Sequence, residues 1–392
     1  MTRVTELSVR DFKAVEEAEV QPGGINLVVG RNNVGKTSLL EALHLALDPS
    51  SISRFDGNLD KVVREGAEEA TVEVVVSGDD RTEDRSVTVE GYDEEAARRR
   101  LRKDVESELG KVTEGIEGNT PEAVSEVIEE VTDKWQKNRN LARDMCLLDN
   151  KTYLSEGYKF NTRFLISNIN LTEPLNERQS DDLLEVGDLM TTADDLVQAG
   201  REMRDELTNT HFITDPGITD DTPDPSADGA AIRRSRIEDF LIDNAIVDGL
   251  VDFSFDRLVF EDGDEREEIP YDFMGSGFKT LVGILWELYD QDADTEVLII
   301  EEPAVHMHPG YVNEFTQQLL QVARQEEVQL FVTTHREDLI ESFFAPPTER
   351  AHGDYLREEF QVIQLTELLT KQLDYEQAET ELDELNTDLR GI

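Results

Sequence analysis

The sequence predicts an α/β protein with a mixed β-sheet flanked by helices, an additional N-terminal antiparallel sheet and a helical insertion. Three apolar stretches, at residues 25–30, 295–303 and 328–335, have the composition of strands buried on both faces. Helical patterns follow the first two stretches, and buried strands that alternate with helices indicate a parallel sheet covered by helices. From about residue 93 the pattern changes to long charged segments of helical period.

We expect three regions along the 392 residues of the chain. Residues 1–92 are predicted to form the N-terminal lobe of a head, in which half-buried strands surround one helix. Residues 93–235 are predicted to form a mostly helical insertion or arm, with helices at 93–112, 120–145 and 180–207 and a strand-like piece at 158–169. Residues 236–392 are predicted to form the C-terminal lobe of the same head, with one strand at 250–262, and to end in an acidic helix at 365–389.

The charge balance is strongly acidic, with 88 Asp and Glu residues against 38 Lys and Arg residues and a formal net charge of -50. A disordered acidic tail and a folded protein adapted to molar salt both explain such a charge. The acidic residues are spread along the chain and interleaved with apolar periodicity, which favours the second explanation. In molar salt the Debye length falls to about 3 Å, so dense like charge does not unfold the chain. We therefore expect a halophilic protein whose charge says little about its partners.

The chain has one cysteine, Cys146, which excludes an intramolecular disulfide. No apolar stretch approaches the ~20 residues that a membrane-spanning helix needs. The first residues lack the apolar core of a signal peptide. These features predict a cytoplasmic protein without membrane contact.

A glycine loop follows the first apolar strand. Gly30 and the triplet Gly35-Lys36-Thr37 have the spacing G-x-x-x-x-G-K-[ST] of a phosphate-binding loop. Glycines let backbone N–H groups turn toward phosphate oxygens, Lys36 supplies a cation, and the Thr37 hydroxyl is a ligand for Mg²⁺. The helix that begins here directs its positive end at the same anion. We expect ATP and Mg²⁺ to bind this loop, which consists of Gly30, Arg31, Asn32, Asn33, Val34, Gly35, Lys36, Thr37 and Ser38.

Two carboxylates, Glu301 and Glu302, end the second apolar strand. A metal ion on the ATP phosphates needs an acidic ligand at such a strand end, so we expect Glu301 to hold Mg²⁺ together with Thr37. Glu302 is expected to orient or deprotonate the attacking water. The alternative is a strand that ends in two solvated acids. The coincidence with a phosphate loop favours the catalytic assignment.

Two further segments carry polar groups at element ends. His335 ends the third apolar strand, where we expect it to contact the γ-phosphate as a polar sensor; a strand-end cap is the alternative. Gly275, Ser276 and Gly277 open a helix and form a second group of anion donors. Because one site needs only one phosphate loop, we expect these donors to face the nucleotide of a second protomer. An ordinary glycine-rich helix start is the alternative.

His306 and His308 form an H-x-H pair without an evident third ligand, so a loop that contacts a dimer partner is favoured over a metal site. Basic residues cluster at 98–103 and 233–236, where DNA contacts and salt-bridged helix faces both fit the pattern. DNA is therefore a candidate partner, although the net charge opposes it.

These stretches, in this order, resemble the ABC-type ATPase heads of the RecF/SMC class. The closest resemblance is to the AAA-type ATPases of the OLD (overcoming lysogenization defect) family. The resemblance is carried by "LSVRDFKAV…INLVVGRNNVGKTSLLEAL", "MGSGFKTL", "LIIEEPAVHMHP" and "VTTH". It implies that two heads form a homodimer with ATP between them, and that residues 275–277 of one head face the phosphates bound by the other. It also implies a role in DNA repair or antiviral defence.

The sequence departs from the pattern of these families in three respects. A glycine precedes Ser276, and Phe278 stands where the signature of related heads carries glutamine. No glutamine occurs between Lys36 and Gln136, so no Q-loop equivalent is assigned. The residues after His335 are too few for the Toprim nuclease domain of OLD nucleases. We therefore expect any nuclease activity to reside in a separate partner.

We expect an ATPase, converting ATP and water to ADP and phosphate, that dimerises on ATP and drives or gates a partner. An SMC-like structural DNA-binding ATPase is the first alternative, and a transporter subunit is a weaker one. The longest uninterrupted helical pattern is roughly 30 residues, or about 45 Å, which is short for an SMC-like tether. That length favours the first hypothesis.

Overall fold

The computed structural model describes residues 2–55, 57–78, 82–113, 129, 133, 137, 141–154, 159–167, 210–214, 229–263, 265–289, 296–366, 369–383 and 388–390. The structural statements below concern these residues.

A six-stranded sheet forms the centre of the molecule, in the order β15-β14-β3-β13-β12-β8. Its strands are β3 (Ile25–Gly30), β8 (Thr210–Ile213), β12 (Val297–Glu301), β13 (Gln329–Thr334), β14 (Phe360–Leu365) and β15 (Thr370–Asp374). All neighbours pair in parallel except β14 and β15, which pair antiparallel. The carboxyl ends of five parallel strands therefore meet at one edge, the edge where open α/β sheets bind ligands.

The central strands are apolar because each of their faces is covered. Along β3, Leu27 and Val29 belong to one hydrophobic core and Val28 belongs to the other. The same alternation occurs in β12, where Leu298 and Ile299 lie on opposite faces. Because strand side chains alternate between faces, an unbroken apolar run is what a strand in this position requires.

A second six-stranded sheet, in the order β2-β1-β4-β5-β6-β7, is antiparallel throughout. Its strands are β1 (Arg3–Phe12), β2 (Val15–Val20), β4 (Glu69–Ser77), β5 (Thr82–Gly91), β6 (Met145–Leu154) and β7 (Lys159–Ser167). In β4 the buried residues alternate with exposed or half-buried ones, so the inner face packs and the outer face meets solvent. Helix α1 (Lys36–Leu47) lies between the two large sheets and contacts strands of both.

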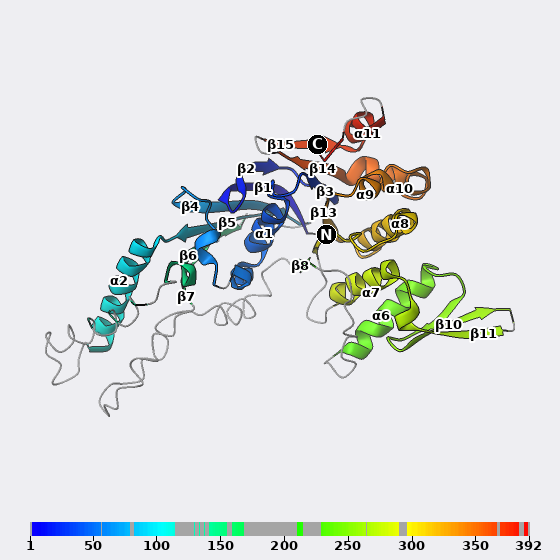
Figure 1. Cartoon of the computed structure of the whole chain (residues 1–392), viewed down its shortest axis with the longest axis horizontal. Coiled ribbons are helices and arrows are strands. Elements are labelled where there is room, and N and C mark those ends of the chain that lie inside the picture. The colour runs from blue at the N-terminus through cyan, green and yellow to red at the C-terminus, as the bar shows by residue number, and fades with distance from the viewer. Residues whose placement is uncertain are drawn as a thin grey trace.

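The opposite face of the central sheet carries most of the remaining helices (Figure 1). The helices are α2 (Glu94–Thr113), α6 (Ala230–Asp243), α7 (Ser276–Leu288), α8 (Pro309–Gln325), α9 (Glu337–Ser342), α10 (Pro346–Glu359) and α11 (Tyr375–Asp383). Short 3₁₀ turns are η1 (Pro49–Phe55), η2 (Leu59–Lys61), η3 (Leu141–Asp144) and η5 (Tyr271–Phe273). Within the described ranges, no helix combines the length and apolarity needed to cross a bilayer.

A small antiparallel sheet, β11-β10-β9, projects at one end of the molecule beside α6, whereas α2 projects at the other end (Figure 1). Its strands are β9 (Leu250–Phe253), β10 (Arg257–Asp262) and β11 (Glu265–Pro270). The single strand predicted for this region is wrong, because the chain turns at residues 254–256 and pairs with itself. Phe253, Phe255 and Tyr271 pack edge to edge there and join the sheet to α7 through Phe278.

The mixed central sheet and the N-terminal antiparallel sheet are confirmed, and so is the helix predicted at the start of the middle region, α2. Strands β6 and β8 were not expected from the pattern of residues 93–235, yet they lie in the two large sheets. The division of the chain at 92 and 235 stays a prediction. The helices predicted at 120–145 and 180–207 lie almost entirely outside the described residues.

The C-terminal region corrects one expectation. Residues predicted to start an acidic helix form β15 instead, and helix α11 begins only at Tyr375. Pairing with β14 and the burial of Leu373 stabilise the strand, so tertiary contacts override a local helical pattern.

Candidate functional site

The loop between β3 and α1 has the backbone of an anion-binding nest. Gly30, Asn33 and Gly35 have φ angles of 151°, 65° and 105°. A side chain at Gly30 would place its Cβ 2.5 Å from the carbonyl oxygen of Leu365, so glycine is required there by contact as well as by conformation. Residues with positive φ turn successive N–H groups toward one point, and the start of α1 adds its own free N–H groups. The loop is therefore shaped to receive phosphate.

Lys36 is folded back onto this loop. Its Nζ donates hydrogen bonds to the carbonyl oxygens of Gly30 at 2.9 Å and Arg31 at 3.0 Å. Burial lowers the pKa of Lys36, while the charges of Glu302 and Glu301 act to raise it. The ammonium group thus lies within electrostatic reach of both acids, although more than 260 residues separate them in the sequence. The structure brings the phosphate loop and the acidic pair into one site.

Thr37 and Glu301, the two residues expected to hold a cation, lie in direct contact. Their side chains form a hydrogen bond in which the Thr37 hydroxyl donates to the carboxylate. Burial raises the pKa of Glu301, and this hydrogen bond and nearby Arg54 oppose the increase. A hydroxyl and one carboxylate suit Mg²⁺, which takes few protein ligands and completes its shell with phosphates and water. The residues present therefore fit the metal that the sequence predicts.

Glu302 follows the last residue of β12 in a left-handed conformation, with φ 46°. Its N–H donates to the carbonyl and hydroxyl oxygens of Thr333, at 3.1 and 3.2 Å, which anchors the turn to β13. A non-glycine residue in this conformation costs about 1 kcal/mol or more. The turn separates Glu302 from its neighbour Glu301, so the two carboxylates meet different partners.

His335 is the partner of Glu302. The ring Nδ1 lies 2.8 Å from Glu302 Oε1, and the backbone N–H of His335 donates to Oε2 at 3.3 Å. Both side chains remain partly exposed, with 48% and 26% of their surface accessible for His335 and Glu302. A carboxylate held by an imidazole at the open end of two neighbouring strands can accept a proton from water and have its orientation fixed.

The segment 275–277 starts α7 next to the loop that follows β12. Ser276 Oγ donates to the carbonyl oxygen of His306 at 3.0 Å. A Cβ on Gly277 would collide with the ring of Tyr311, at 2.1 Å from Cε1, whereas a Cβ on Gly275 would meet open space. Gly275 and Ser276 are exposed, so the N–H groups at the start of α7 open outward. The Ser276 hydrogen bond therefore connects residues 275–277 to the loop that follows β12 in the same chain.

The remaining predicted residues have simple positions. Arg31, Asn32 and Asn33 are exposed on the phosphate loop, Val34 is half-buried and Ser38 is buried.

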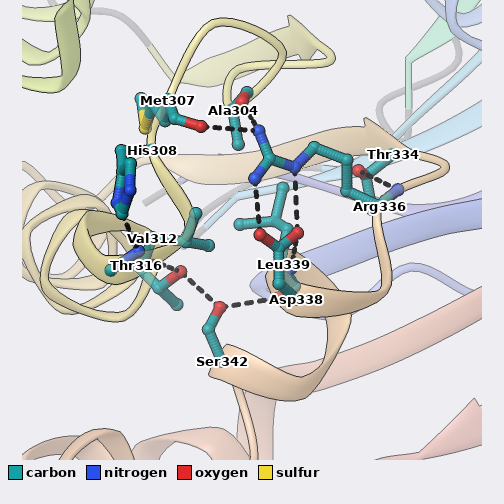
Figure 2. Close-up of polar contacts among 11 residues, drawn as sticks. Ala304, Met307, His308, Val312, Thr316, Thr334, Arg336, Asp338, Leu339 and Ser342 are labelled. Atoms are coloured by element: carbon teal, nitrogen blue, oxygen red, sulfur yellow. Dashed lines mark hydrogen bonds and ion pairs between the residues drawn. The ribbon is translucent and has the colours of Figure 1, made fainter.

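The histidine pair has a structural explanation. His308 is the N-cap of α8, with Nδ1 accepting from the N–H of Gly310 at 3.1 Å (Figure 2). His306 is exposed in the loop that accepts the Ser276 hydrogen bond. In the part of the chain that the structure describes, no cluster of three His, Cys, Asp or Glu side chains has the arrangement of a metal site. A metal at the H-x-H pair is therefore not supported there.

Sequence reasoning missed Arg54, which lies beside Glu301. Its guanidinium packs 4.2 Å from the centre of the Phe212 ring, on β8. Burial lowers the pKa of Arg54, and the charges of Glu41 and Glu301 counteract this shift. No local motif marks this arginine, because its neighbours come from three distant segments. It compensates the negative charge that gathers around the predicted metal position.

The basic clusters are engaged within the fold. Arg98 and Arg99 form ion pairs of 2.5 Å with glutamates four residues earlier on α2. Arg233 and Arg236 pack over the rings of Trp286 and Tyr289. These contacts agree with the alternative that both clusters are salt-bridged or packed helix faces.

Comparison with known proteins finds one curated relative of limited extent. A stretch of 78 residues is 36% identical to the DNA double-strand break repair Rad50 ATPase of Methanopyrus kandleri, and it covers 20% of this chain and 8% of that relative. The chain thus spans less than a tenth of the length of the curated relative that it matches.

Solved structures with similar architecture include SMC heads. The SMC head domain from Thermotoga maritima is 12% identical, with a TM-score of 0.40, over 95% of this chain and 98% of that chain. The Smc head domain with an extended coiled coil from Pyrococcus furiosus, bound to the C-terminal domain of ScpA, is 12% identical, with a TM-score of 0.41, over 99% and 100%.

The strand–loop–helix element, the acids after β12 and the two-sheet architecture together confirm the predicted fold class, a P-loop ATPase head of ABC type. A family model matches residues 25–341, from β3 to α9. The chain therefore belongs to the family described as AAA domain, putative AbiEii toxin, Type IV TA system.

Proposed function

We propose that this chain binds ATP with Mg²⁺ and hydrolyses it, and that two copies close on the nucleotide in the manner of ABC-type and OLD-family ATPases. One observation carries this proposal. Glu302, paired with His335, lies at the same sheet edge as Lys36, Thr37 and Glu301. That edge therefore combines a phosphate receptor, a set of cation ligands and a general base.

The roles of the side chains follow from their positions. The loop at 30–38 holds the phosphates through backbone N–H groups, and Lys36 leaves its carbonyl partners to neutralise the β/γ-phosphates. Thr37 and Glu301 hold Mg²⁺, which when bound neutralises charge that develops on the phosphates. Glu302 accepts a proton from the attacking water, and His335 fixes the Glu302 carboxylate and contacts the γ-phosphate side of the site.

The dimer is supported by the outward-facing start of α7. Its free N–H groups and Ser276 form an anion site that is separate from the phosphate loop of the same chain. A second copy, placed with its phosphate loop against Gly275, Ser276 and Gly277, would complete two equivalent ATP sites. Such an isologous arrangement satisfies the symmetry of a two-fold dimer.

The biological role that we propose is a nucleotide-driven gate for a separate nuclease or other effector in DNA repair or antiviral defence. The family description names a toxin of a type IV system, and the Rad50 relative is named for double-strand break repair. The net charge of -50 supports a halophilic host. A cytoplasmic location is part of the same proposal.

An SMC-like DNA-binding role is the second candidate. Its support is the basic face of α2, but Arg98 and Arg99 there already pair with Glu94 and Glu95. Replacing the arginines of this face by glutamates distinguishes DNA binding from ATPase activity. A DNA-binding role requires that the reversed variant lose its gel shift and keep its basal ATPase activity.

The decisive experiment compares the wild-type protein with Glu302→Gln in molar KCl with ATP and Mg²⁺. We expect the variant to bind ATP and to lose hydrolysis by about 100-fold or more. Light scattering should then show about twice the protomer mass of 44.4 kDa. Glu267→Gln, on the exposed strand β11, is the matched control and should behave as wild type. A Glu302→Gln protein that binds ATP but stays monomeric would reject the dimer.

A further inference from the structure

The loop between β12 and α8, residues 303–308, receives hydrogen bonds from two elements that flank it. On one side, Ser276 at the start of α7 donates to the carbonyl oxygen of His306. On the other side, Arg336 donates to the carbonyl oxygens of Ala304 and Met307, the latter at 3.0 Å (Figure 2). This loop therefore links the proposed dimer face to the end of β13.

Arg336 is held in one orientation by several partners at once. Its Nε donates to Asp338 Oδ1 at 2.9 Å, and a second donor reaches the other carboxylate oxygen of Asp338. Its backbone N–H donates to the Thr334 hydroxyl at 3.0 Å. The side chain is only 17% exposed. Figure 2 shows the guanidinium between the loop carbonyls and Asp338, with its planar fork engaged on both sides.

The segment that carries Arg336 also carries the partner of the catalytic acid. His335 directly precedes it and contacts Glu302, and Glu302 is among the charges that act on the Arg336 guanidinium. The loop at 303–308 is therefore connected to His335 through the hydrogen bonds of Arg336 and one peptide bond.

We propose that Arg336 is a positioning residue that couples the docking of a second copy to the geometry of the Glu302–His335 pair. This inference rests on the proposed ATP-dependent dimer. When Ser276 turns from His306 toward a phosphate of the other protomer, the loop loses one of its two supports. Arg336, which is hydrogen-bonded to the loop, then moves with it and changes the position of the adjacent His335. Hydrolysis therefore proceeds at full rate only in the closed dimer.

An arginine is required for this role, because three acceptors surround one guanidinium. A lysine has the same charge but presents a single ammonium group, which cannot serve Asp338 and two separated carbonyl oxygens with one planar geometry. Arg336→Lys therefore keeps the positive charge but loses the hydrogen bonds that connect the loop at 303–308 to Asp338. Arg357→Lys is the matched control, since Arg357 forms an exposed ion pair with Glu349 at 2.6 Å, away from the site.

The first test measures steady-state ATPase rates, ATP affinity and thermal unfolding for wild type, Arg336→Lys and Arg357→Lys. We expect kcat of Arg336→Lys to fall about 10-fold to 100-fold, as small misplacements of catalytic groups do, with ATP affinity within twofold of wild type. The control should match wild type in all three measurements. If kcat of Arg336→Lys stays within twofold of wild type, or if affinity and melting temperature fall together with kcat, the inference is wrong.

The second test addresses coupling directly. In wild type, the rate per protomer should rise with protein concentration as dimers form. In Arg336→Lys the rate should stay flat, while Glu302→Gln/Arg336→Lys should still form ATP-bound dimers by light scattering. A double variant that fails to dimerise assigns Arg336 to dimer assembly and overturns the coupling. A Glu302→Gln protein without ATP-dependent dimers overturns the proposed function and this inference together, whereas normal Glu302→Gln dimers with a concentration-dependent Arg336→Lys rate overturn this inference alone.

Discussion

The two ends of the central sheet are built from different chemistry. At the carboxyl ends of the strands, Glu301, Glu302 and His335 are titratable and at least partly exposed, and the buried Lys36 lies near the two glutamates. At the amino ends, two neutral amides are completely buried, Asn26 on β3 and Gln329 on β13. One end gathers charge at strand termini, and the other contains uncharged groups whose hydrogen bonds are satisfied within the protein.

The amide end joins the two large sheets. Gln329 Nε2 donates to the carbonyl oxygens of Val4 at 2.9 Å and Gly23 at 2.7 Å, and its Oε1 accepts from the N–H of Val4 at 2.8 Å. Asn26 likewise accepts from the N–H of Gly23 and donates to its carbonyl oxygen, both at 2.9 Å. Buried amides with full sets of partners contribute stability and specify how the sheets pack.

The comparison shows that the residues that stabilise the fold and the residues of the candidate site lie at opposite ends of the strands. The charged end has a left-handed glutamate and a buried lysine, and both features cost stability. Substitutions at the two ends should therefore have opposite signatures, with ligand binding lost at one end and folding lost at the other.

The largest effect is expected for Lys36→Ala. Removing the cation should weaken ATP binding by about 100-fold, because a phosphate group would lose a charge-assisted partner in a partly buried site. The free energy of unfolding without nucleotide should stay the same or rise, since burial of Lys36 lowers its pKa and is therefore unfavourable for its charged form. Titration with a fluorescent ATP analogue and urea unfolding measure the two quantities. Lys371→Ala on β15, which removes an ion pair with Glu381 on α11, is the control and should bind ATP normally.

The opposite signature is expected for Gln329→Ala. The change removes the side-chain partner of the buried N–H and carbonyl groups of Val4, whereas the carbonyl oxygen of Gly23 keeps its bond from Asn26, and it should lower the free energy of unfolding by about 2–3 kcal/mol. Urea unfolding measures the loss, and nucleotide titration of the folded protein should give wild-type affinity. Gln325→Ala, which removes a hydrogen bond to Asn244 in an exposed position, should have little effect. Reduced ATP affinity in folded Gln329→Ala would contradict the separation of the two ends.

A smaller effect on rate alone is expected for His335→Gln. The imidazole contact to Glu302 is lost, while the backbone N–H of residue 335 can still reach the carboxylate. We expect kcat to fall by roughly 10-fold, with ATP affinity and unfolding free energy close to wild type. Steady-state kinetics with nucleotide titration separate these quantities. A lower affinity with an unchanged kcat would assign His335 to ATP binding instead.

The smallest effect concerns pH and His44 on α1. Burial lowers the pKa of His44 to about 4, with Arg54 and His211 acting in the same direction and Asp48 opposing them. The unfolded chain therefore binds this proton more tightly than the folded protein, so stability falls as pH decreases from about 6.5 toward 4. His44→Phe should remove about 1 kcal/mol of this loss at pH 5.5. Urea unfolding from pH 8 to pH 5 should show a shallower decrease for the variant, and parallel curves would contradict the assignment.

The elements that the sequence predicted well are those whose pattern is local. Buried strands β3, β12 and β13 are mainly apolar, and the glycine spacing at 30–37 specifies both a backbone conformation and a chemistry. The proximity of Lys36 to the acids at the end of β12 follows from parallel pairing, which places strand ends at one edge.

The features that were missed depend on distant partners. Strand β8 has four residues, and its place beside β12 comes from pairing rather than from an apolar pattern. In β14, Gln364 interrupts the apolar run and is buried because its amide donates to the carbonyl oxygen of Leu389 at 2.7 Å. Arg54 and Arg336 are recognisable only when segments far apart in the sequence are assembled. Local periodicity contains no information about such contacts.

Helix α1 lies between the two large sheets, contacts strands of both and begins at the phosphate loop. A ligand bound at the first turn of α1 therefore acts on the helix that contacts both large sheets. Nucleotide arrival would stiffen the two sheets together and would slow amide exchange on surfaces that never contact it. A protein that docks on the outside of either sheet would thus bind a surface whose flexibility depends on whether nucleotide is bound.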